Sequence, residues 1–344
     1  LTVSAVLGNA AGIVKQGAGT MELTGVNTYS GATTISAGTL EIGGSGQLDS
    51  GSYAQAIANN GTFNYNSSAD QTLSGLISGS GAVVKDNSGN LTITASNTYS
   101  GGTTINGGTV ILASGASEDA LGSGAVTMNS GGSLQLWISA GGNHNIDNDF
   151  TMDGGTVYSK DGQYNLTGTM TLNVGGGTLG GTWSDKHIQV SGVISGAGGL
   201  TIVDFPSSQN GDVILSGVNT YTGNTTVSGG TLTLSAADNN IASSATIDVA
   251  SGAYLDVSGI SNGFALASGQ TLSGAGTVTG DMTIALGSVL SPGNSPGTLS
   301  TGSQTWEDGG AFLWEINDSG GNQGADPGWD WLDITGTLDL SSLT

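Results

Sequence analysis

The chain contains no cysteine, so neither disulfide bonds nor thiolate metal sites can stabilise it. Arginine is also absent. The only cations are four lysines against 26 acidic residues, which gives a formal net charge of −22. A surface this acidic repels phosphate backbones and anionic lipid headgroups. Nucleic acids and anionic membrane surfaces are therefore not expected as partners.

Apolar side chains are scarce for a chain of this length. Only 36% of the 344 residues are hydrophobic and 6% aromatic, too few for one large globular core. No apolar run approaches the roughly 20 residues that a membrane-spanning helix needs. An elongated fold in which each layer buries only a few side chains fits these numbers. The chain has no signal peptide and opens in what reads as mid-repeat, so we expect a mature or trimmed segment of a longer protein.

Glycine, by contrast, is abundant. There are 63 glycines, together with many Ser, Thr and Asn residues and only four prolines. They follow no strict three-residue period, which excludes collagen, and the scattered Val, Ile and Leu argue against disorder. The composition predicts short strands separated by tight turns.

Three segments of equal length align without gaps. They read LTGVNTYSGATTISAGTL (23–40), ITASNTYSGGTTINGGTV (93–110) and LSGVNTYTGNTTVSGGTL (215–232). The two intervals between their Asn-Thr-Tyr triplets lie near whole multiples of a coil of roughly 23–24 residues. We therefore expect β-helix coils, three in the first interval and five in the second.

Within a copy, apolar residues fall on every second position, as in strands. The inward residues of the first copy are predicted to be Met21, Leu23, Ile35, Leu40 and Ile42. No window shows a glycine-free helical period, so almost no helix is expected. The repeated polar positions are read as structural, with the asparagines stacked as an amide ladder at a corner. These positions are Asn27, Tyr29, Asn97, Tyr99, Asn219 and Tyr221.

The predicted fold is all-β. A parallel β-helix is expected over residues 1–304, followed by a truncated β-rich capping region at 305–344. Four tryptophans mark the cap: Trp306, Trp314, Trp329 and Trp331. Trp314 and Ile316 alternate like inward strand residues, and a cap would cover the open end of a solenoid. An aromatic platform for sugar stacking is the functional alternative.

The three copies resemble the passenger-associated transport repeat of bacterial autotransporters, also called the autotransporter-associated β-strand repeat. Residues 23–40 match its typical form, L-T-G-x-N-T-Y-S-G-x-T-T-I-x-x-G-T-L, almost completely. Residues 272–302 and 312–340 are similar to the last coils of such passengers and to the segment after them. The resemblance implies a right-handed parallel β-helix, secreted or displayed at the bacterial cell surface in association with the outer membrane. It also implies that the repeats assist secretion and folding.

Oxygen ligands for Ca²⁺ can be sought in two acidic clusters. Asp147, Asp149 and Asp153 lie in NHNIDNDFTMDGG beside His144. The segment is neither an EF-hand loop nor a Ca²⁺-binding β-roll repeat, and a solvated edge with Asx turns is the alternative. The second cluster surrounds the tryptophans and consists of Asp326, Asp330 and Asp333. No other metal or cofactor is expected, because two histidines without a further ligand do not indicate zinc.

The favoured function is a non-catalytic structural and adhesive element that displays regular Thr/Asn-rich faces to surface glycans or other cells. Each contact would be weak and the attachment multivalent. A filament subunit that stacks head to tail on itself is a second hypothesis. A polysaccharide-active enzyme is a third, and it is disfavoured because such β-helix enzymes generally bind uronates with Arg or Lys. Fold alone does not decide between them.

Overall fold

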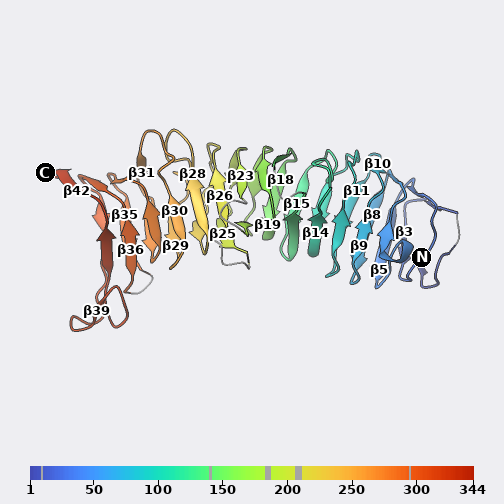
Figure 1. The fold of residues 1–344 in the computed structure, drawn as a ribbon, viewed down its shortest axis with the longest axis horizontal. Helices are drawn as coiled ribbons and strands as arrows, with labels where there is room; N and C mark the ends of the chain where they lie inside the picture. The colour runs from blue at the N-terminus through green and yellow to red at the C-terminus, as the bar shows by residue number, and fades with distance from the viewer. Residues whose placement is uncertain (9–10, 139–141, 183–186, 206–210, 294–295) are drawn as a thin grey trace. The chain divides into compact units, whose positions relative to one another are not determined.

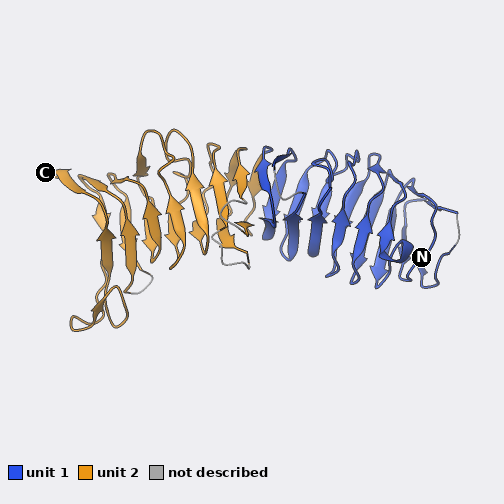
Figure 2. Cartoon of the chain, in the orientation of Figure 1, with its two compact units in different colours: residues 1–168 blue, residues 169–344 orange. Residues whose placement is uncertain are grey.

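The computed structural model describes residues 1–8, 11–138, 142–182, 187–205, 211–293 and 296–344. It divides into two compact units, residues 1–168 and 169–344 (Figure 2). In the described ranges the regular structure is β-strand apart from one 3₁₀ turn, η1 (Asp49–Gly51). The strands pair in parallel with strands one coil away, so the chain is a parallel β-solenoid, as predicted. Its right-handed winding stays a prediction.

Unit 1 winds through three sheets whose strands lie side by side (Figure 1). The first sheet contains β1 (Thr2–Val3), β3 (Thr20–Leu23), β5 (Thr39–Gly44), β8 (Thr62–Ser67), β11 (Ala82–Lys85), β13 (Thr103–Ile105), β15 (Val126–Asn129) and β18 (Phe150–Asp153). The second contains β6 (Ser52–Tyr53), β9 (Gln71–Leu73), β12 (Leu91–Ile93), β14 (Gly108–Leu112), β16 (Gly132–Leu136) and β19 (Gly155–Ser159). The third contains β2 (Ile13–Lys15), β4 (Thr33–Ile35), β7 (Ile57–Asn59) and β10 (Ile77–Ser78), and β17 (Asn143–Ile146) pairs separately with β20 (Gln163–Leu166).

Unit 2 repeats the plan. One of its sheets contains β22 (Gly177–Gly181), β25 (Leu200–Asp204), β27 (Thr225–Val227), β29 (Thr246–Val249), β32 (Thr271–Gly274), β35 (Val289–Pro292) and β38 (Ala311–Phe312). A second contains β23 (Ile188–Val190), β26 (Asp212–Leu215), β28 (Thr231–Leu234), β30 (Tyr254–Asp256), β33 (Thr277–Thr279), β36 (Thr298–Thr301) and β41 (Trp331–Ile334). The others are β21 (Met170–Leu172) with β24 (Ile194–Gly196), the set β31 (Phe264–Leu266), β34 (Met282–Ile284), β37 (Gln304–Glu307) and β42 (Leu338–Ser342), and the pair β39 (Asn322–Gln323) and β40 (Gly328–Trp329).

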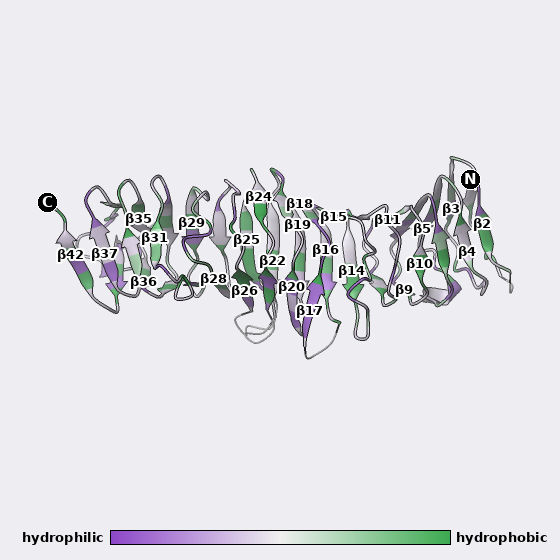
Figure 3. Cartoon of the chain, turned by 90° about the horizontal axis from the view of Figure 1, so that it is seen from above, coloured by the Kyte–Doolittle hydropathy of each residue, from purple (hydrophilic) through white to green (hydrophobic). Residues whose placement is uncertain are grey.

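The core is a column of inward side chains, one set per coil. Figure 3 shows hydrophobic and hydrophilic residues alternating along individual strands. Leu23, Ile35, Leu40 and Ile42 are fully buried, as predicted, whereas Met21 is only partly buried. The register stacks inward residues on one another, so that Leu40 lies between Met21 and Phe63. Burial of such side chains contributes about 25 cal/mol per Å² of apolar surface.

The predicted spacing of the repeat copies needs a correction. Thr20 pairs with Thr39, and Val126 pairs with Phe150, so the coils of unit 1 are unequal and on average shorter than predicted. The first copy places its Thr-Thr-Ile strand, β4, in the third sheet, and the second copy places its equivalent, β13, in the first sheet. The step from the first copy to the second is therefore three coils plus one face.

One glycine of the repeat is required by the backbone. Gly38, Gly108 and Gly230 occupy the same place in the three copies and have φ angles of 69°, 64° and 71°. This left-handed conformation strains any residue with a Cβ. The glycine therefore sets the turn at the start of the following strand, which begins at Thr39 in β5, at Gly108 in β14 and at Thr231 in β28.

The segment after residue 304 continues the parallel pairing. β38 pairs with β35, β41 with β36 and β42 with β37. Thr298 and Trp331 are register partners even though the chain makes a long excursion through β39 and β40 between them (Figure 1). The division of the chain at residue 304 stays a prediction.

Candidate functional site

In the first two copies, the side chain of the repeated asparagine hydrogen-bonds to the main chain of both neighbouring coils. The Oδ1 of Asn27 accepts from the Leu7 main-chain N–H at 3.0 Å, and its Nδ2 donates to the Gln47 carbonyl at 3.1 Å. Asn97 does the same with Ile77 and Ala120, both at 2.7 Å. In the third copy, Asn219 Oδ1 accepts from Ile194 N–H at 2.9 Å. These side chains bind the main chain of neighbouring coils, in place of the predicted amide ladder.

The repeated tyrosines are buried, and their hydroxyls take part in further hydrogen bonds of the interior. Tyr99 and Thr103 share a hydrogen bond of 2.6 Å between their hydroxyls, and Thr103 Oγ1 donates to the Leu121 carbonyl in the next coil at 3.2 Å. The Tyr29–Thr33 and Tyr221–Thr225 pairs are the same, at 2.8 and 2.6 Å. A buried hydroxyl must find a partner, which explains why Thr follows Tyr at a fixed distance in each copy. The signature is a structural one.

Two lysines are buried at equivalent positions of the repeat in unit 1, a feature that the sequence did not predict. Lys85 Nζ donates to the carbonyls of Asp86 (2.5 Å), Asn87 (2.7 Å) and Gly107 (3.1 Å). Lys15 Nζ binds three carbonyls at the same offsets, at 2.7 to 3.1 Å. Burial lowers the pKa of Lys85 to about 8, and nearby Asp86 and Asp70 oppose this shift. Lys160 is exposed, and Lys186 lies outside the described residues.

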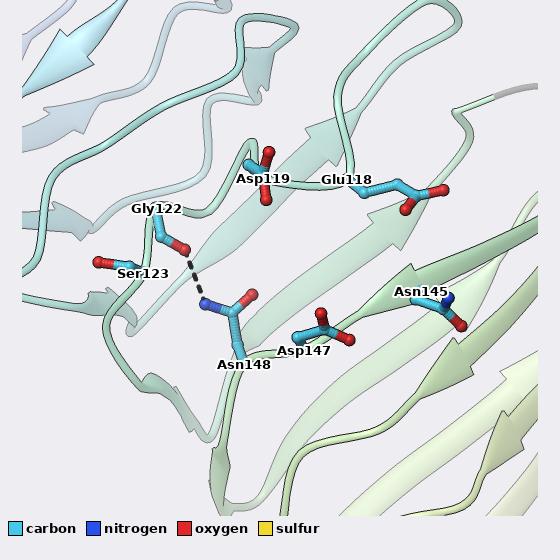
Figure 4. A pocket seen from close by; sticks show the side chains of 7 residues that line it. All are labelled: Glu118, Asp119, Gly122, Ser123, Asn145, Asp147 and Asn148. Atoms are coloured by element: carbon cyan, nitrogen blue, oxygen red, sulfur yellow. Dashed lines mark hydrogen bonds between the residues drawn. The ribbon is translucent and has the colours of Figure 1, made fainter.

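A polar hollow of about 230 Å³ opens on the surface of unit 1 (Figure 4). It is lined by Glu118, Asp119, Gly122, Ser123, Asn145, Asp147 and Asn148. Glu118 and Asp119 come from the loop before β15, and Asp147 and Asn148 from the residues before β18. The coil period brings these loops together, because Val126 N–H donates to the Asp149 carbonyl one coil later.

Acidic groups dominate this hollow. Glu118 Oε1 lies 3.0 Å from His144 Nδ1. Asp119 Oδ2 accepts from the Ser96 hydroxyl at 3.3 Å, and Asp147 Oδ1 accepts from the Thr167 hydroxyl at 2.5 Å. No lysine is among the residues that line the hollow. Its walls therefore present oxygen acceptors to solvent.

Asn148 is held rigidly at the floor of the hollow. Its side chain is 8% exposed, and Nδ2 donates to the carbonyls of Gly122 at 2.9 Å and Gly124 at 2.8 Å. These two acceptors fix the orientation of the amide, so Oδ1 points into the space between Asp119 and Asp147 (Figure 4). Glu118, Asp119 and Asn148 were not predicted from the sequence. The coil period was the signal that could have linked them.

The predicted Ca²⁺ ligands are dispersed. Of the first cluster only Asp147 lines the hollow, while Asp149 and Asp153 are exposed elsewhere on the strand and its approach. Asp153 is the register partner of Asn129. In the part of the chain that the structure describes, no three His, Asp or Glu side chains gather closely enough to hold a metal ion. Calcium binding stays a prediction.

The C-terminal candidates are likewise engaged in other contacts. Asp330 is 3% exposed and accepts from the main-chain N–H groups of Gly297 (3.1 Å) and Glu315 (2.8 Å). Asp326 Oδ1 accepts from Asn317 Nδ2 at 3.1 Å, and Asp333 lies opposite Ser300 in the parallel register. Asp330 therefore links its own segment to the segments that contain Gly297 and Glu315.

The tryptophans spread over the last coil. Trp306 packs edge-on against Phe312 at 6.3 Å between ring centroids, and Trp314 Nε1 donates to the Asp330 carbonyl at 2.8 Å. Trp329 is half-buried and Trp331 is 40% exposed. The inward orientation predicted for Trp314 and Ile316 is wrong, because β38 ends at Phe312 and both side chains are about half exposed. The capping role stays a prediction.

Residues 13–42, 83–112 and 209–234 match the family model of the passenger-associated-transport-repeat. The adhesin BmaC autotransporter of Brucella suis biovar 1 (strain 1330) is 33% identical over 260 residues. The chain contains the passenger-associated repeats of autotransporters and is similar to part of an autotransporter adhesin. The match covers 64% of this chain but only 7% of the Brucella protein, so the chain spans a small part of that relative's length. No solved structure matches the chain.

The passenger repeats place this chain outside the bacterial cell, secreted or at the cell surface in association with the outer membrane. Each matched segment of unit 1 contains both a buried lysine and an Asn-Thr-Tyr triplet, so the matched motif coincides with the buried hydrogen-bonding groups described above. Among the described residues, no helix has the length and apolar character needed to cross a membrane.

Proposed function

We propose that this chain is a non-catalytic adhesive segment of a bacterial cell-surface protein and attaches to glycans or to the surfaces of other cells. The observation that carries the proposal is the match to a Brucella protein named an adhesin, over most of this chain. The match covers a small part of that protein, so its named role comes to this chain as an inference.

The exterior of unit 1 supports an attachment role. The register aligns Thr104, Thr127 and Thr151 on the outer face of three successive strands. Beside them, Asn129 Nδ2 donates to Asn106 Oδ1 at 2.6 Å, and Asn106 Nδ2 donates to Asp86 Oδ1 at 2.7 Å. Parallel strands repeat about every 4.8 Å, so the face presents hydroxyl and amide groups in regular rows. Such rows suit many weak contacts with a repetitive polymer.

The interior supports a non-catalytic role. The repeated Asn and Lys side chains are buried and bind main-chain groups, and the repeated Tyr and Thr hydroxyls are buried and bind one another. They serve the fold and are not available to a substrate. The polar hollow of unit 1 is small beside the usual ligand pockets of about 300–1,000 Å³.

The direct test is adhesion of beads coated with the purified chain to epithelial cells and to immobilised glycans. Beads coated with an unrelated acidic protein of similar charge are the control. We expect the chain to retain beads under flow and the control to wash away. Equal retention of both would contradict the proposal, and filaments formed by the free chain would replace it with the polymer hypothesis.

A further inference from the structure

We propose that the interior of unit 2 binds one water molecule between the side-chain amides of Asn219 and Asn240. The two residues lie in successive coils, and the main-chain N–H of Asn219 donates to the Asn240 carbonyl at 3.1 Å. They are only 6% and 3% exposed. This water is a structural ligand of the solenoid, so the inference is independent of the adhesive function.

One atom of each amide has no hydrogen-bond partner among the residues that the structure describes. These atoms are Asn219 Nδ2, which is a donor, and Asn240 Oδ1, which is an acceptor. Buried polar atoms in native proteins nearly always bind another protein group or an ordered water. Leaving them unbonded costs free energy that a bound ligand recovers.

The other atom of each amide is already bonded, and this fixes the orientation of both side chains. Asn219 Oδ1 accepts from the main-chain N–H of Ile194 at 2.9 Å. Asn240 Nδ2 donates to the carbonyls of Leu215 at 2.9 Å and Gly217 at 3.0 Å. Turning either amide over would break these bonds, so a change of orientation cannot satisfy the two unbonded atoms.

The first copy of the repeat shows why the donor of Asn219 lacks an acceptor. There the equivalent Asn27 Nδ2 donates to the Gly25 carbonyl at 2.8 Å. Gly217 stands at the Gly25 position of the third copy, but its carbonyl accepts from Asn240. The buried amide of Asn240 therefore occupies the acceptor that the repeat normally offers to its own asparagine.

A second acceptor of the repeat is also occupied. In the second copy, Asn97 Nδ2 donates to the Ala120 carbonyl at 2.7 Å. The equivalent carbonyl in the third copy belongs to Ile241, and it accepts from Gln270 Nε2 at 2.9 Å. Side chains of later coils thus take both carbonyls, and Asn219 Nδ2 requires an acceptor from outside the chain.

Water matches the chemistry of the two unbonded atoms. It can accept from Asn219 Nδ2 and donate to Asn240 Oδ1 at the same time. A metal ion does not fit, because the hydrogens of Nδ2 would face it, and burial disfavours a charged ligand. Buried waters commonly make about three hydrogen bonds to protein groups that are otherwise unsatisfied. The water therefore joins two coils where the other copies use a direct bond from asparagine to a carbonyl.

The test is a crystal structure of the purified chain at a resolution that shows ordered water. We expect a water at about 3 Å from both Asn219 Nδ2 and Asn240 Oδ1. The matched control in the same crystal is Asn27, whose Nδ2 donates to two carbonyls and should have no water beside it. A direct hydrogen bond between the two amides, or no density between them, would overturn the inference.

A variant assigns the water to the Asn240 side chain. Asn240→Leu removes the unbonded acceptor and frees the Gly217 carbonyl, so Asn219 Nδ2 should donate to that carbonyl and the water should be lost. Asn262→Leu replaces an exposed asparagine of the same unit and should retain the water. A water that persists beside Asn219 in Asn240→Leu would contradict the proposed bridge. If that variant does not fold, the crystal of the unaltered chain still decides.

Discussion

Strand β11 of unit 1 and strand β25 of unit 2 hold the same position of the repeat, but a different side chain points inward there in each. In unit 1 the position is Lys85, opposite Ile105 in the register, and in unit 2 it is Ile202, opposite Val227. The coil that follows Lys85 is shorter than the coil that follows Ile202. In the short coil, the main-chain carbonyls of Asp86, Asn87 and Gly107 point toward Lys85, and its ammonium group donates to all three. A solenoid position therefore accepts a charge where the main chain supplies three acceptors.

The largest effect is expected from removing that ammonium group. Lys85→Met keeps the length of the side chain but leaves three inward carbonyls without their donor. Each unsatisfied buried acceptor costs about 1–3 kcal/mol, so unit 1 should lose about 3 kcal/mol or more. Chemical denaturation followed by circular dichroism measures the loss.

The matched control is Ile202→Met in unit 2, an apolar exchange of similar volume that should cost less than about 1.5 kcal/mol. Equal losses of stability in the two variants would contradict the distinction between the Lys85 and Ile202 positions. Hydrogen exchange of the β11 and β25 amides assigns each loss to its own unit.

A smaller effect is expected from the buried hydroxyl pair of the second copy. Thr103→Val removes the donor to the Leu121 carbonyl and the partner of the Tyr99 hydroxyl while keeping the shape. The loss of free energy of unfolding should be about 1–3 kcal/mol. The same change on the outer face, Thr104→Val, should lie within about 0.5 kcal/mol. A similar cost at both positions would show that the Tyr–Thr pair has no special role.

The last expected effect is a change of stability with pH. Burial lowers the folded-state pKa of Lys85 to about 8, below the ordinary value of 10.5. Between these two values the unfolded chain keeps a proton that the folded chain has released. Stability from this group therefore rises with pH across that window and is flat below it.

Denaturation of the wild type and of Lys85→Met, at pH values from neutral up to the ordinary lysine pKa of 10.5, tests this sign. The difference in free energy of unfolding between them should grow toward high pH. A difference that shrinks would mean that the three carbonyls stabilise the charged ammonium more strongly than burial penalises it.

The sequence predicted the fold well because a solenoid repeats local rules. Local sequence determines the alternation of apolar residues, such as Leu40 and Ile42, and the recurring Gly38 position. Both can therefore be recognised without the tertiary structure. The sheet to which each copy contributes its Thr-Thr strand was not predicted. The length of the coils varies within unit 1, and these differences add up until the equivalent strand falls in another sheet.

The candidate site was less predictable. Asp147 was recognised as a ligand-type residue, but it was grouped with Asp149 and Asp153 by sequence proximity. Asp147 and Asp149 precede β18 and Asp153 is its last residue, so the three carboxylates are spread along the direction of the strand. The true neighbours, Glu118 and Asp119, come from the preceding coil. Buried Lys85 was read only as a scarce cation, since nothing in the sequence marks the three carbonyls around it.

The interior of this solenoid maintains the fold, and we propose that the exterior makes the attachment. The most direct measurement is bead adhesion under flow for the triple variant Thr104→Ala, Thr127→Ala and Thr151→Ala, with circular dichroism to confirm an unchanged fold. We expect a folded chain with clearly weakened adhesion. Wild-type adhesion by the folded triple variant would contradict the claim that this outer face carries the attachment.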